Sequence, residues 1–189
     1  MIFNDKTIVF DVETTGLEVG SDEILQLSII NGNGEVLFNE LIKPSNKQKW
    51  EDAERVHHIT PEMVQNCKTI NFYKKRIQEI FVNANVLIEY NGQFDIRFLN
   101  AVGIDVYAES MNEEEPRKGK PNKKYLDVML DFAEIYGEWS DYHNCYKWQK
   151  LVTAANYYHY QFNAHDSLED VRATLFVAKN IYVGKKDAE

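Results

Sequence analysis

The stretch Thr7-Ile8-Val9-Phe10-Asp11-Val12-Glu13 decides the fold, because its β-branched and apolar residues predict a buried β-strand. Asp11 and Glu13 lie two residues apart on that strand, so both side chains project from the same face. Two ionised carboxylates side by side in a core would repel each other and lose hydration, unless a divalent cation joined them. A sheet edge in contact with water would also accommodate the pair. These two residues alone leave a metal site and a wet sheet edge equally open.

Two further strands follow at 24–30 and 35–42, and between them Asn31-Gly32-Asn33-Gly34 is a strong turn signal. Three strands joined by short turns predict an antiparallel meander. A short buried strand is expected at 86–90. Helical spacing of apolar residues predicts helices over 71–83, from Phe94 to near Gly103, and around Trp148 to Ala155. Helix-start and helix-stop residues predict a helix over 126–136, one that starts at Thr60-Pro61, and a final one that starts near Asp166 or Ser167. This order predicts an α/β layered domain.

The segment 109–124 differs from the rest, since it is charged, contains two prolines and lacks apolar periodicity. We interpret it as a mobile, solvated loop within a single domain spanning 1–189. Its five basic residues could instead guide a phosphate backbone, although Glu113 to Glu115 balance them.

The net charge of −9 disfavours a broad duplex-binding surface, because phosphate neutralisation usually requires basic protein. It is compatible with an enzyme that holds a few nucleotides at a metal centre. The chain shows no signal-peptide pattern and no apolar run of roughly 20 residues, so we expect no membrane contact. Cys67 and Cys145 match no zinc spacing, which predicts free thiols and a cytoplasmic protein.

Two more places carry candidate acids. Asp95 follows the strand at 86–90 and starts a helix, where it could complement the helix dipole or supply a third carboxylate at a strand end. His165 precedes the final helix and could reach the region of Asp170. Taken singly, each of these residues is better explained as an ordinary surface or helix-end group.

Together they match an ordered pattern. Asp11 to Leu17, which reads Asp-Val-Glu-Thr-Thr-Gly-Leu, resembles the first motif of the proofreading-type exonucleases of the DEDD superfamily. Asn91 with Phe94-Asp95 resembles the second motif, and His165 with Asp170 resembles the third motif of its histidine-bearing (DEDDh) subgroup, which includes DNA polymerase III epsilon. The resemblance covers about residues 7 to 180.

The resemblance implies a ribonuclease H-like fold with a central mixed sheet, in which helices flank an antiparallel meander and parallel strands. It implies a 3′→5′ exonuclease that releases nucleoside 5′-monophosphates from a single-stranded DNA or RNA 3′ end. On this reading four carboxylates ligate two Mg²⁺ or Mn²⁺ ions, and His165 accepts a proton from water. The four are Asp11, Glu13, Asp95 and Asp170.

The same resemblance implies a substrate-binding set. Thr14, Thr15, Gly16 and Leu17 match a loop that contacts the terminal nucleotide, and His57 and Phe94 match side chains beside it. Core packing is the alternative role for Leu17 and Phe94. Two positions depart from the family pattern: His58 stands where glycine is common, and Tyr90 where a histidine often precedes the asparagine. These departures bear on substrate preference more than on catalysis.

Alternative functions remain: a catalytically silent nucleic-acid-binding module, or a metal phosphodiesterase for small esters on the same fold. A DNA polymerase subunit is a candidate partner. The sequence fixes neither DNA against RNA nor the oligomeric state, and a dimer is compatible with it.

Overall fold

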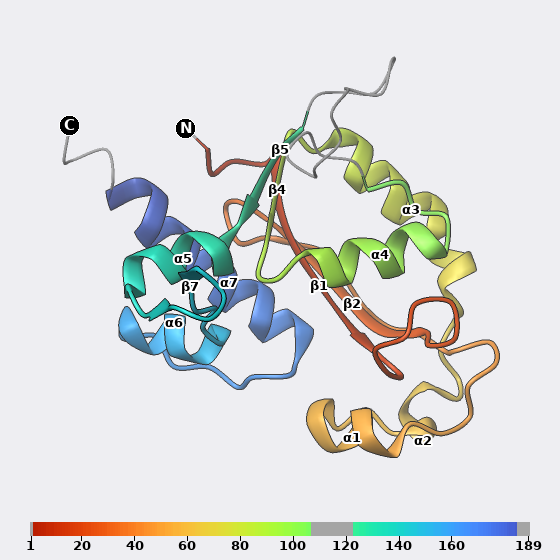
Figure 1. The fold of residues 1–189 in the computed structure, drawn as a ribbon. Coiled ribbons are helices and arrows are strands. Elements are labelled where there is room, and N and C mark those ends of the chain that lie inside the picture. Colours follow the sequence, from red (N-terminus) through yellow and green to blue (C-terminus); the bar gives the residue numbers. More distant parts are fainter. Residues whose placement is uncertain (1, 107–122, 185–189) are drawn as a thin grey trace.

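A computed structural model describes residues 2–106 and 123–184. At its centre lies a five-stranded sheet with the order β3-β2-β1-β4-β5 (Figure 1). The predicted meander is confirmed, because β1 (Thr7–Thr14) pairs antiparallel with β2 (Ile24–Asn31), which pairs antiparallel with β3 (Val36–Leu41). On the other side of β1, β4 (Val86–Glu89) and β5 (Lys124–Asp127) run parallel to it, so the sheet is mixed as expected.

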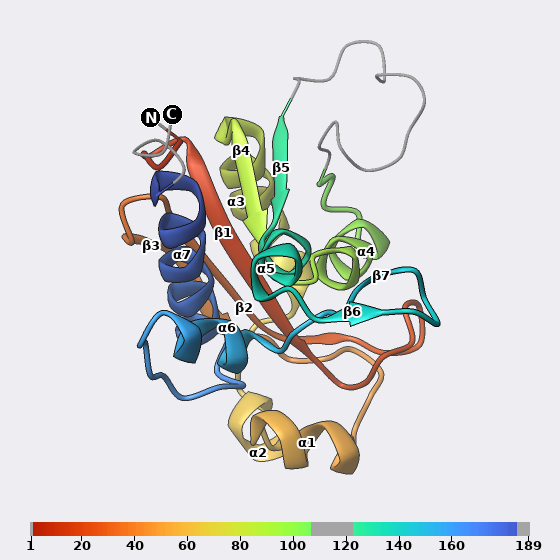
Figure 2. The same cartoon turned by 60° about the vertical axis from the view of Figure 1, so that its left-hand side comes forward.

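Helices cover both faces of this sheet. One face packs against α3 (Ile70–Asn83) and α4 (Gln93–Ala101) (Figure 1). The other packs against α5 (Val128–Tyr136), α6 (Leu151–Tyr157) and α7 (Ser167–Gly184), and Figure 2 shows α7 lying along the sheet. Below the sheet lie α1 (Glu51–His57) and α2 (Pro61–Val64), and the β6–β7 hairpin follows α5 (Trp139–Ser140 and Cys145–Tyr146). None of the helices described is long and apolar enough to cross a bilayer.

The side chains of β1 alternate between the two helical layers. Phe10 and Val12 belong to the core beside α3 and α4, whereas Val9 belongs to the core beside α5, α6 and α7. Asp11 and Glu13 continue the face of Val9 because strand side chains alternate with a period of two. The acidic pair therefore projects toward the layer that contains α7.

Two predicted boundaries are wrong at the end of the charged segment. Residues 109–122 of the expected loop lie outside the described residues, but its last two residues, Lys123 and Lys124, are held in place. The buried Lys123 ammonium donates to the backbone carbonyl of Ala84 at 2.6 Å, and Lys124 begins β5. The helix expected from 126 begins at Val128, because Asp127 ends the strand and its Oδ1 accepts the Met129 N–H at 3.0 Å.

The helix expected to include Trp148 begins only at Leu151. Lys150 is extended, with ψ of 151°, and the Trp148 side chain is 65% exposed. The preceding residues are tied instead to the β6–β7 hairpin, where the Lys147 N–H donates to the Glu138 carbonyl at 2.8 Å. Trp148 thus lies on a loop outside the core.

Candidate active site

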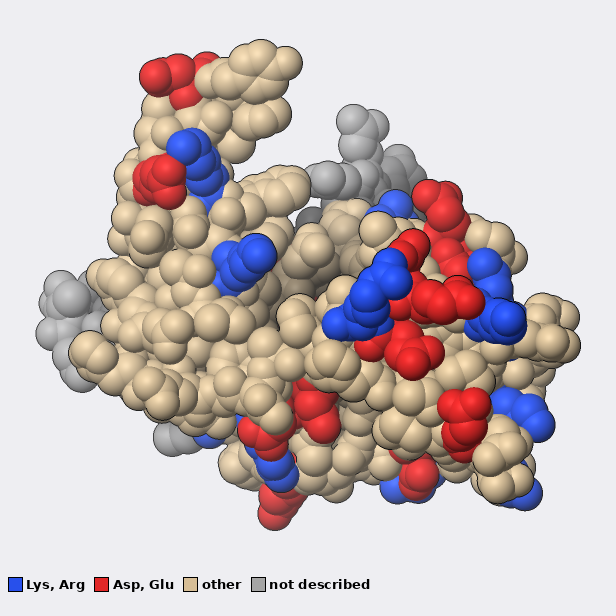
Figure 3. Space-filling view, turned by 90° about the horizontal axis from the view of Figure 1, so that it is seen from below, with Lys and Arg blue, Asp and Glu red and all other residues tan. Residues whose placement is uncertain are grey.

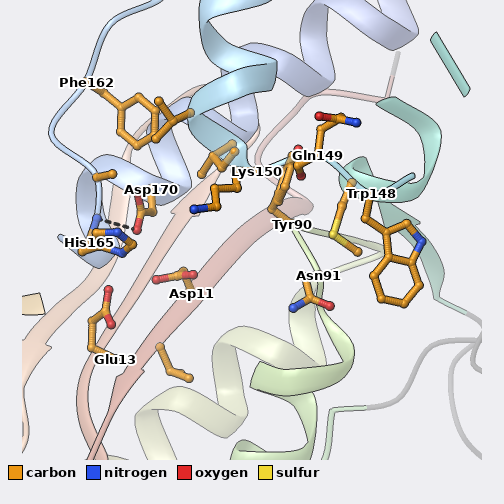
Figure 4. Close-up of a pocket in the computed structure, with 15 residues that line it drawn as sticks. Asp11, Glu13, Tyr90, Asn91, Trp148, Gln149, Lys150, Phe162, His165 and Asp170 are labelled. Atoms are coloured by element: carbon orange, nitrogen blue, oxygen red, sulfur yellow. Dashed lines mark hydrogen bonds between the residues drawn. The ribbon is translucent and has the colours of Figure 1, made fainter. Parts of the chain in front are cut away.

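Side chains from β1 and α7 meet in one cavity of about 530 Å³. Asp11, Glu13, His165 and Asp170 all line it (Figure 4). Ligand atoms of Glu13, His165 and Asp170 all lie within 4.8 Å of one another, although the three residues are more than 150 positions apart at the extremes. The fold therefore brings the first and third predicted motifs together.

The start of α7 is fixed by polar contacts that position Asp170. Asp166 is its N-terminal cap, since its Oδ1 accepts the N–H of Leu168 at 2.9 Å. The buried Ser167 hydroxyl lies 2.6 Å from the Ser28 hydroxyl on β2. Because Ser28 pairs with Asp11 in the sheet register, this bond places the first turn of α7 beside Asp11.

His165 immediately precedes this turn in a left-handed backbone conformation, with φ of 71°. Its backbone N–H donates to Asp170 Oδ2 at 3.1 Å, which closes the turn (Figure 4). Left-handed backbone is uncommon for residues other than glycine, so the turn holds His165 at some conformational cost. The exposed imidazole consequently faces the carboxylates and remains open to solvent.

Asp95 reaches β1 from α4. Its buried side chain accepts the N–H of Val12 through Oδ1 at 2.8 Å, so it is anchored between Asp11 and Glu13. Asp95 does not line the 530 Å³ cavity, but its negative charge acts on Asp11. Burial is the larger cause of the raised pKa of Asp11, and the charge of Asp95 is the next. The second predicted motif thus joins the same acidic centre from another layer.

Among the described residues, no lysine or arginine forms an ion pair with any of the four carboxylates. Burial, then the Asp170 charge, raises the pKa of Glu13 to about 8, and burial raises the pKa of Asp95 and of Asp170 to about 7. The pKa of Asp11 is raised well above its ordinary value by burial and by its acidic neighbours. Its buried Oδ2 has no hydrogen-bond partner in the described part of the chain. The centre concentrates negative charge that the protein does not neutralise.

Such a donor set suits divalent cations. Carboxylate oxygens are the ligands that Mg²⁺ and Mn²⁺ prefer, and a bound cation would lower the pKa values that burial and mutual repulsion raise. The orphaned oxygen of Asp11 and the Glu13, His165 and Asp170 group fit this chemistry. The imidazole nitrogen of His165 is the one non-oxygen donor of that group.

A second cavity of about 640 Å³ adjoins the first and shares Val12 and Glu13 with it. All six residues of the predicted substrate-binding set line it: Thr14, Thr15, Gly16, Leu17, His57 and Phe94. The structure therefore gathers this set in one hollow. On the face below the sheet, Figure 3 shows acidic side chains gathered with basic ones on one part and no broad basic patch among the described residues.

The local contacts decide between the alternatives for these residues. Leu17 is 78% exposed, so the core-packing interpretation of Leu17 is wrong. Phe94 is half-buried, packs against the core and also lines the cavity. His57 is buried, which lowers its pKa, and its Nε2–H donates to the Thr14 carbonyl at 3.1 Å while Nδ1 accepts the Ile59 N–H. His57 thereby supports the loop after β1.

The backbone conformation at His58 explains why glycine is common at this position in the family. His58 ends α1 with φ of 61°, a left-handed conformation that glycine adopts without a steric penalty. The position therefore suits glycine, and histidine occupies it with some strain.

Several residues at or beside the cavities were missed by sequence reasoning. Trp148 and Lys150 line the first cavity, as do Asn91, noted only as part of a motif, and Tyr90, noted only as a departure from the family pattern. Glu89 is fully buried in the apolar β4, and burial followed by the Asp95 and Asp127 charges raises its pKa well above the ordinary value. A glutamate directly after the apolar run Val86–Ile88 was the signal that could have identified it.

Comparison with known proteins places the chain in a family. The exonuclease family model RNase_T matches residues 8–178. An uncharacterised exonuclease, CP81 of Escherichia phage 186, is 32% identical over 180 residues, which cover 90% of this chain and 85% of that protein. The DNA polymerase III epsilon subunit of Treponema pallidum is 30% identical over 99 residues, covering 49% of this chain and 43% of the subunit.

Solved structures agree on the fold. A zinc-bound E. coli ExoI–ssDNA complex superposes with a TM-score of 0.71 at 20% identity over 95% of this chain and 41% of that chain. Exonuclease X in complex with 5′ overhanging duplex DNA superposes with a TM-score of 0.58 at 16% identity over 94% and 93%. The predicted ribonuclease H-like fold is confirmed. The chain belongs to the exonuclease family, within the DEDD superfamily that its motifs resemble, and is a nuclease.

Proposed function

We propose that this nuclease is a two-metal 3′→5′ exonuclease that removes nucleoside 5′-monophosphates from the 3′ end of single-stranded DNA or RNA. One observation carries the proposal: four carboxylates from three separate segments meet without an ion pair to a lysine or arginine in the described part of the chain, and Asp11 keeps an orphaned buried oxygen. Three of these acids line the first cavity, and the second cavity adjoins it at Glu13, so the two together give room for a strand.

Asp11, Glu13, Asp95 and Asp170 would hold the two ions. When bound, Mg²⁺ or Mn²⁺ supplies Lewis-acid stabilisation of the phosphate and makes water a better nucleophile at neutral pH. His165 would accept the proton of the attacking water, since its imidazole faces the acids and stays open to solvent. The backbone turn with Asp170 keeps that imidazole oriented.

The terminal nucleoside would occupy the second cavity. The exposed Leu17 offers an apolar surface to a base, and the half-buried Phe94 offers an aromatic one. Gly16 keeps the loop narrow, because a Cβ there would lie 2.5 Å from Asp22 Oδ2. Apolar and aromatic contacts of this kind tolerate any base identity, which suits an enzyme that shortens a strand stepwise.

CP81 matches this chain along 85% of its own length, whereas the T. pallidum epsilon subunit matches over 43% and a PolC-type polymerase III of Thermotoga maritima over 7%. The nuclease part is therefore what this chain shares with the polymerase proteins.

A time course on 5′-labelled single-stranded DNA and RNA of equal length, with Mn²⁺ or Mg²⁺ and with chelator, tests the proposal. A ladder that shortens one nucleotide at a time and stops with chelator is expected, and the faster substrate gives the preference. If a folded protein shortens neither strand, the proposal fails and the silent binding module or the small-ester phosphodiesterase takes its place.

A further inference from the structure

The cavity that holds the acids extends to a segment outside all three motifs. Trp148 and Lys150 line it together with Asp11 and Asn91. Figure 4 shows the Lys150 amine directed toward the acidic side chains, and the Trp148 indole beside Asn91. Both side chains are exposed, the indole by 65%. An aromatic ring and a cation thus stand at the edge of a centre made of carboxylates.

The segment is anchored and does not hang free. The Tyr90 hydroxyl donates to the Gln149 carbonyl at 2.8 Å, which ties the loop to the end of β4. On the other side, Lys147 Nζ donates to Glu138 Oε1 at 2.7 Å and Gln149 Nε2 donates to the Lys147 carbonyl at 3.1 Å. Because its neighbours are fixed, the large apolar ring of Trp148 stays exposed to water, which is unfavourable in free energy. A ligand with a flat apolar surface would cover the ring and remove that cost.

The arrangement of the two cavities suggests which ligand. They share Val12 and Glu13, so they meet at Glu13, while Asp11 and Asp170 line the cavity that contains Trp148. If the terminal nucleoside fills the Leu17 and Phe94 cavity and its phosphate lies at the acids, the strand continues into the cavity that contains Trp148. The next nucleotide along the strand then lies within reach of an indole and an amine.

We propose that Trp148 and Lys150 form a subsite for the nucleotide on the 5′ side of the scissile bond. Trp148 stacks on its base, and Lys150 binds the phosphate that follows it toward the 5′ end. Tyr90 is a positioning residue that holds both through Gln149. The inference rests on the proposed function and deepens it, because it assigns the leaving part of the strand to the β7–α6 loop. Stacking is tolerant of base identity, and Lys150 offsets phosphate repulsion from the acids.

An abasic substrate tests the stacking. Specificity (kcat/KM) is measured on a 5′-labelled oligodeoxynucleotide and on the same strand with an abasic penultimate nucleotide. Trp148→Ala should lower kcat/KM about ten-fold on the normal strand and less than about two-fold on the abasic strand, because the abasic strand has already lost the stacked base. The control Tyr142→Ala changes a 92% exposed aromatic on the same hairpin that does not line the cavity, and should alter neither value.

Salt dependence tests the phosphate contact. Lys150→Met should raise KM with little change in kcat and should lower the slope of log KM against log salt by about one. Lys75→Met, at an exposed lysine of α3, should leave the slope unchanged. Tyr90→Phe should reproduce part of both losses, since it removes the hydroxyl that anchors Gln149 and keeps the ring.

The subsite is overturned if Trp148→Ala lowers kcat/KM equally on the normal and abasic strands, or on neither, or if Lys150→Met leaves the salt slope unchanged. These results require an active wild-type enzyme. A wild-type protein that shortens no strand contradicts the proposed function instead, so the two failures are distinguishable.

Discussion

Two groups of acids lie on either side of the loop after β1, and the protein treats them in opposite ways. Asp22 accepts hydrogen bonds from the Thr15 hydroxyl at 2.9 Å and the Glu18 N–H at 3.0 Å, and Lys47 pairs with it at 3.0 Å. Although burial opposes it, these bonds lower the pKa of Asp22. Glu23 beside it accepts three backbone N–H groups, each at 2.8 Å, from residues 45–47.

The side chains of Asp11 and Glu13, about ten residues earlier, have no such hydrogen bonds or ion pair among the described residues. The pKa of each is raised by burial and by neighbouring acids, and Asp11 Oδ2 is without a partner in the described part of the chain. Acids of the Asp22 kind stabilise the fold when ionised, whereas acids of the Asp11 kind destabilise it. Asp22 thus has the hydrogen bonds and the cation that Asp11 Oδ2 lacks in the described part of the chain, and the proposed metal ions would supply the missing positive charge.

The largest expected effect is at Asp11. Asp11→Asn should lower exonuclease turnover by about a thousand-fold, because it removes a metal ligand at the reacting phosphate. Without metal the variant should melt a few degrees higher than the wild type, since it relieves repulsion among the acids. The control Asp5→Asn removes an exposed acid that lines neither cavity and should change neither quantity. A fully active Asp11→Asn enzyme would contradict the two-metal assignment.

His165 should give the next largest effect. His165→Ala should lower kcat by about 10² to 10³, as expected for loss of a general base, and change Mn²⁺ affinity far less. Single-turnover rates and calorimetric Mn²⁺ titration separate the two. If the substitution mainly weakens Mn²⁺ binding, His165 is a ligand and not the base.

The pH dependence of stability distinguishes the two groups of acids. Folded-state pKa values of about 8 for Glu13 and about 7 for Asp95 and Asp170 exceed the ordinary values of 4.5 and 3.8, so the unfolded chain binds fewer protons between pH about 4 and 8. The free energy of unfolding of the metal-free protein should therefore fall as pH rises through that window. Urea unfolding at pH 5 and pH 8 measures it, and saturating Mn²⁺ at pH 8 should restore stability. A metal-free protein that is more stable at pH 8 would show that these acids are not mutually repelling.

A smaller effect is expected at Gly16. The new Cβ of Gly16→Ala would lie 2.5 Å from Asp22 Oδ2, so Asp22 must shift away from Thr15 and Lys47. We expect a loss of about 1 to 3 kcal/mol in the free energy of unfolding. In the double variant with Asp22→Ala the two losses should be less than additive, because the clash is gone. Additive losses would place the origin of the strain elsewhere.

The smallest effect is expected at Asp22 itself. Asp22→Asn should cost about 1 kcal/mol at pH 7, a value discounted for the partial exposure of Lys47. Because the pKa of Asp22 is lowered, its contribution is present above pH about 4 and is lost below it. The difference between wild type and variant should therefore shrink as pH falls from 5 to 3, opposite in sign to the trend at Asp11. Urea unfolding of both proteins at these pH values provides the comparison.

Sequence patterns predicted the parts of the site that local motifs encode. The β-branched and apolar residues of 7–13 predicted the strand, and the two-residue spacing of Asp11 and Glu13 predicted their shared face. A cap at Asp166 or Ser167 predicted the start of the final helix. The convergence of the strand and the helix is set by long-range contacts such as the bond between Ser28 and Ser167, which no local pattern reveals.

The parts that were missed depend on contacts between distant loops. Trp148 is spaced from Leu151 and Val152 as residues on one face of a helix are, yet it lies outside α6. Hydrogen bonds from Tyr90 to Gln149 and from Lys147 to Glu138 hold its neighbours in the loop. Leu126 and Asp127, the last two residues of β5, were included in the predicted helix for a similar reason. An apolar residue such as Leu126 suits either element, and the pairing of β5 with β4 decides.

Calorimetric titration of the metal-free protein with Mn²⁺ at pH 7, repeated in buffers of different ionisation enthalpy, tests the central claim most directly. We expect two bound ions per chain and release of protons into the buffer, because carboxyls with raised pKa values must lose protons to bind metal. Asp11→Asn should reduce both the number of ions and the protons released. Binding without proton release, or binding that Asp11→Asn leaves unchanged, would contradict a metal centre built on these four carboxylates.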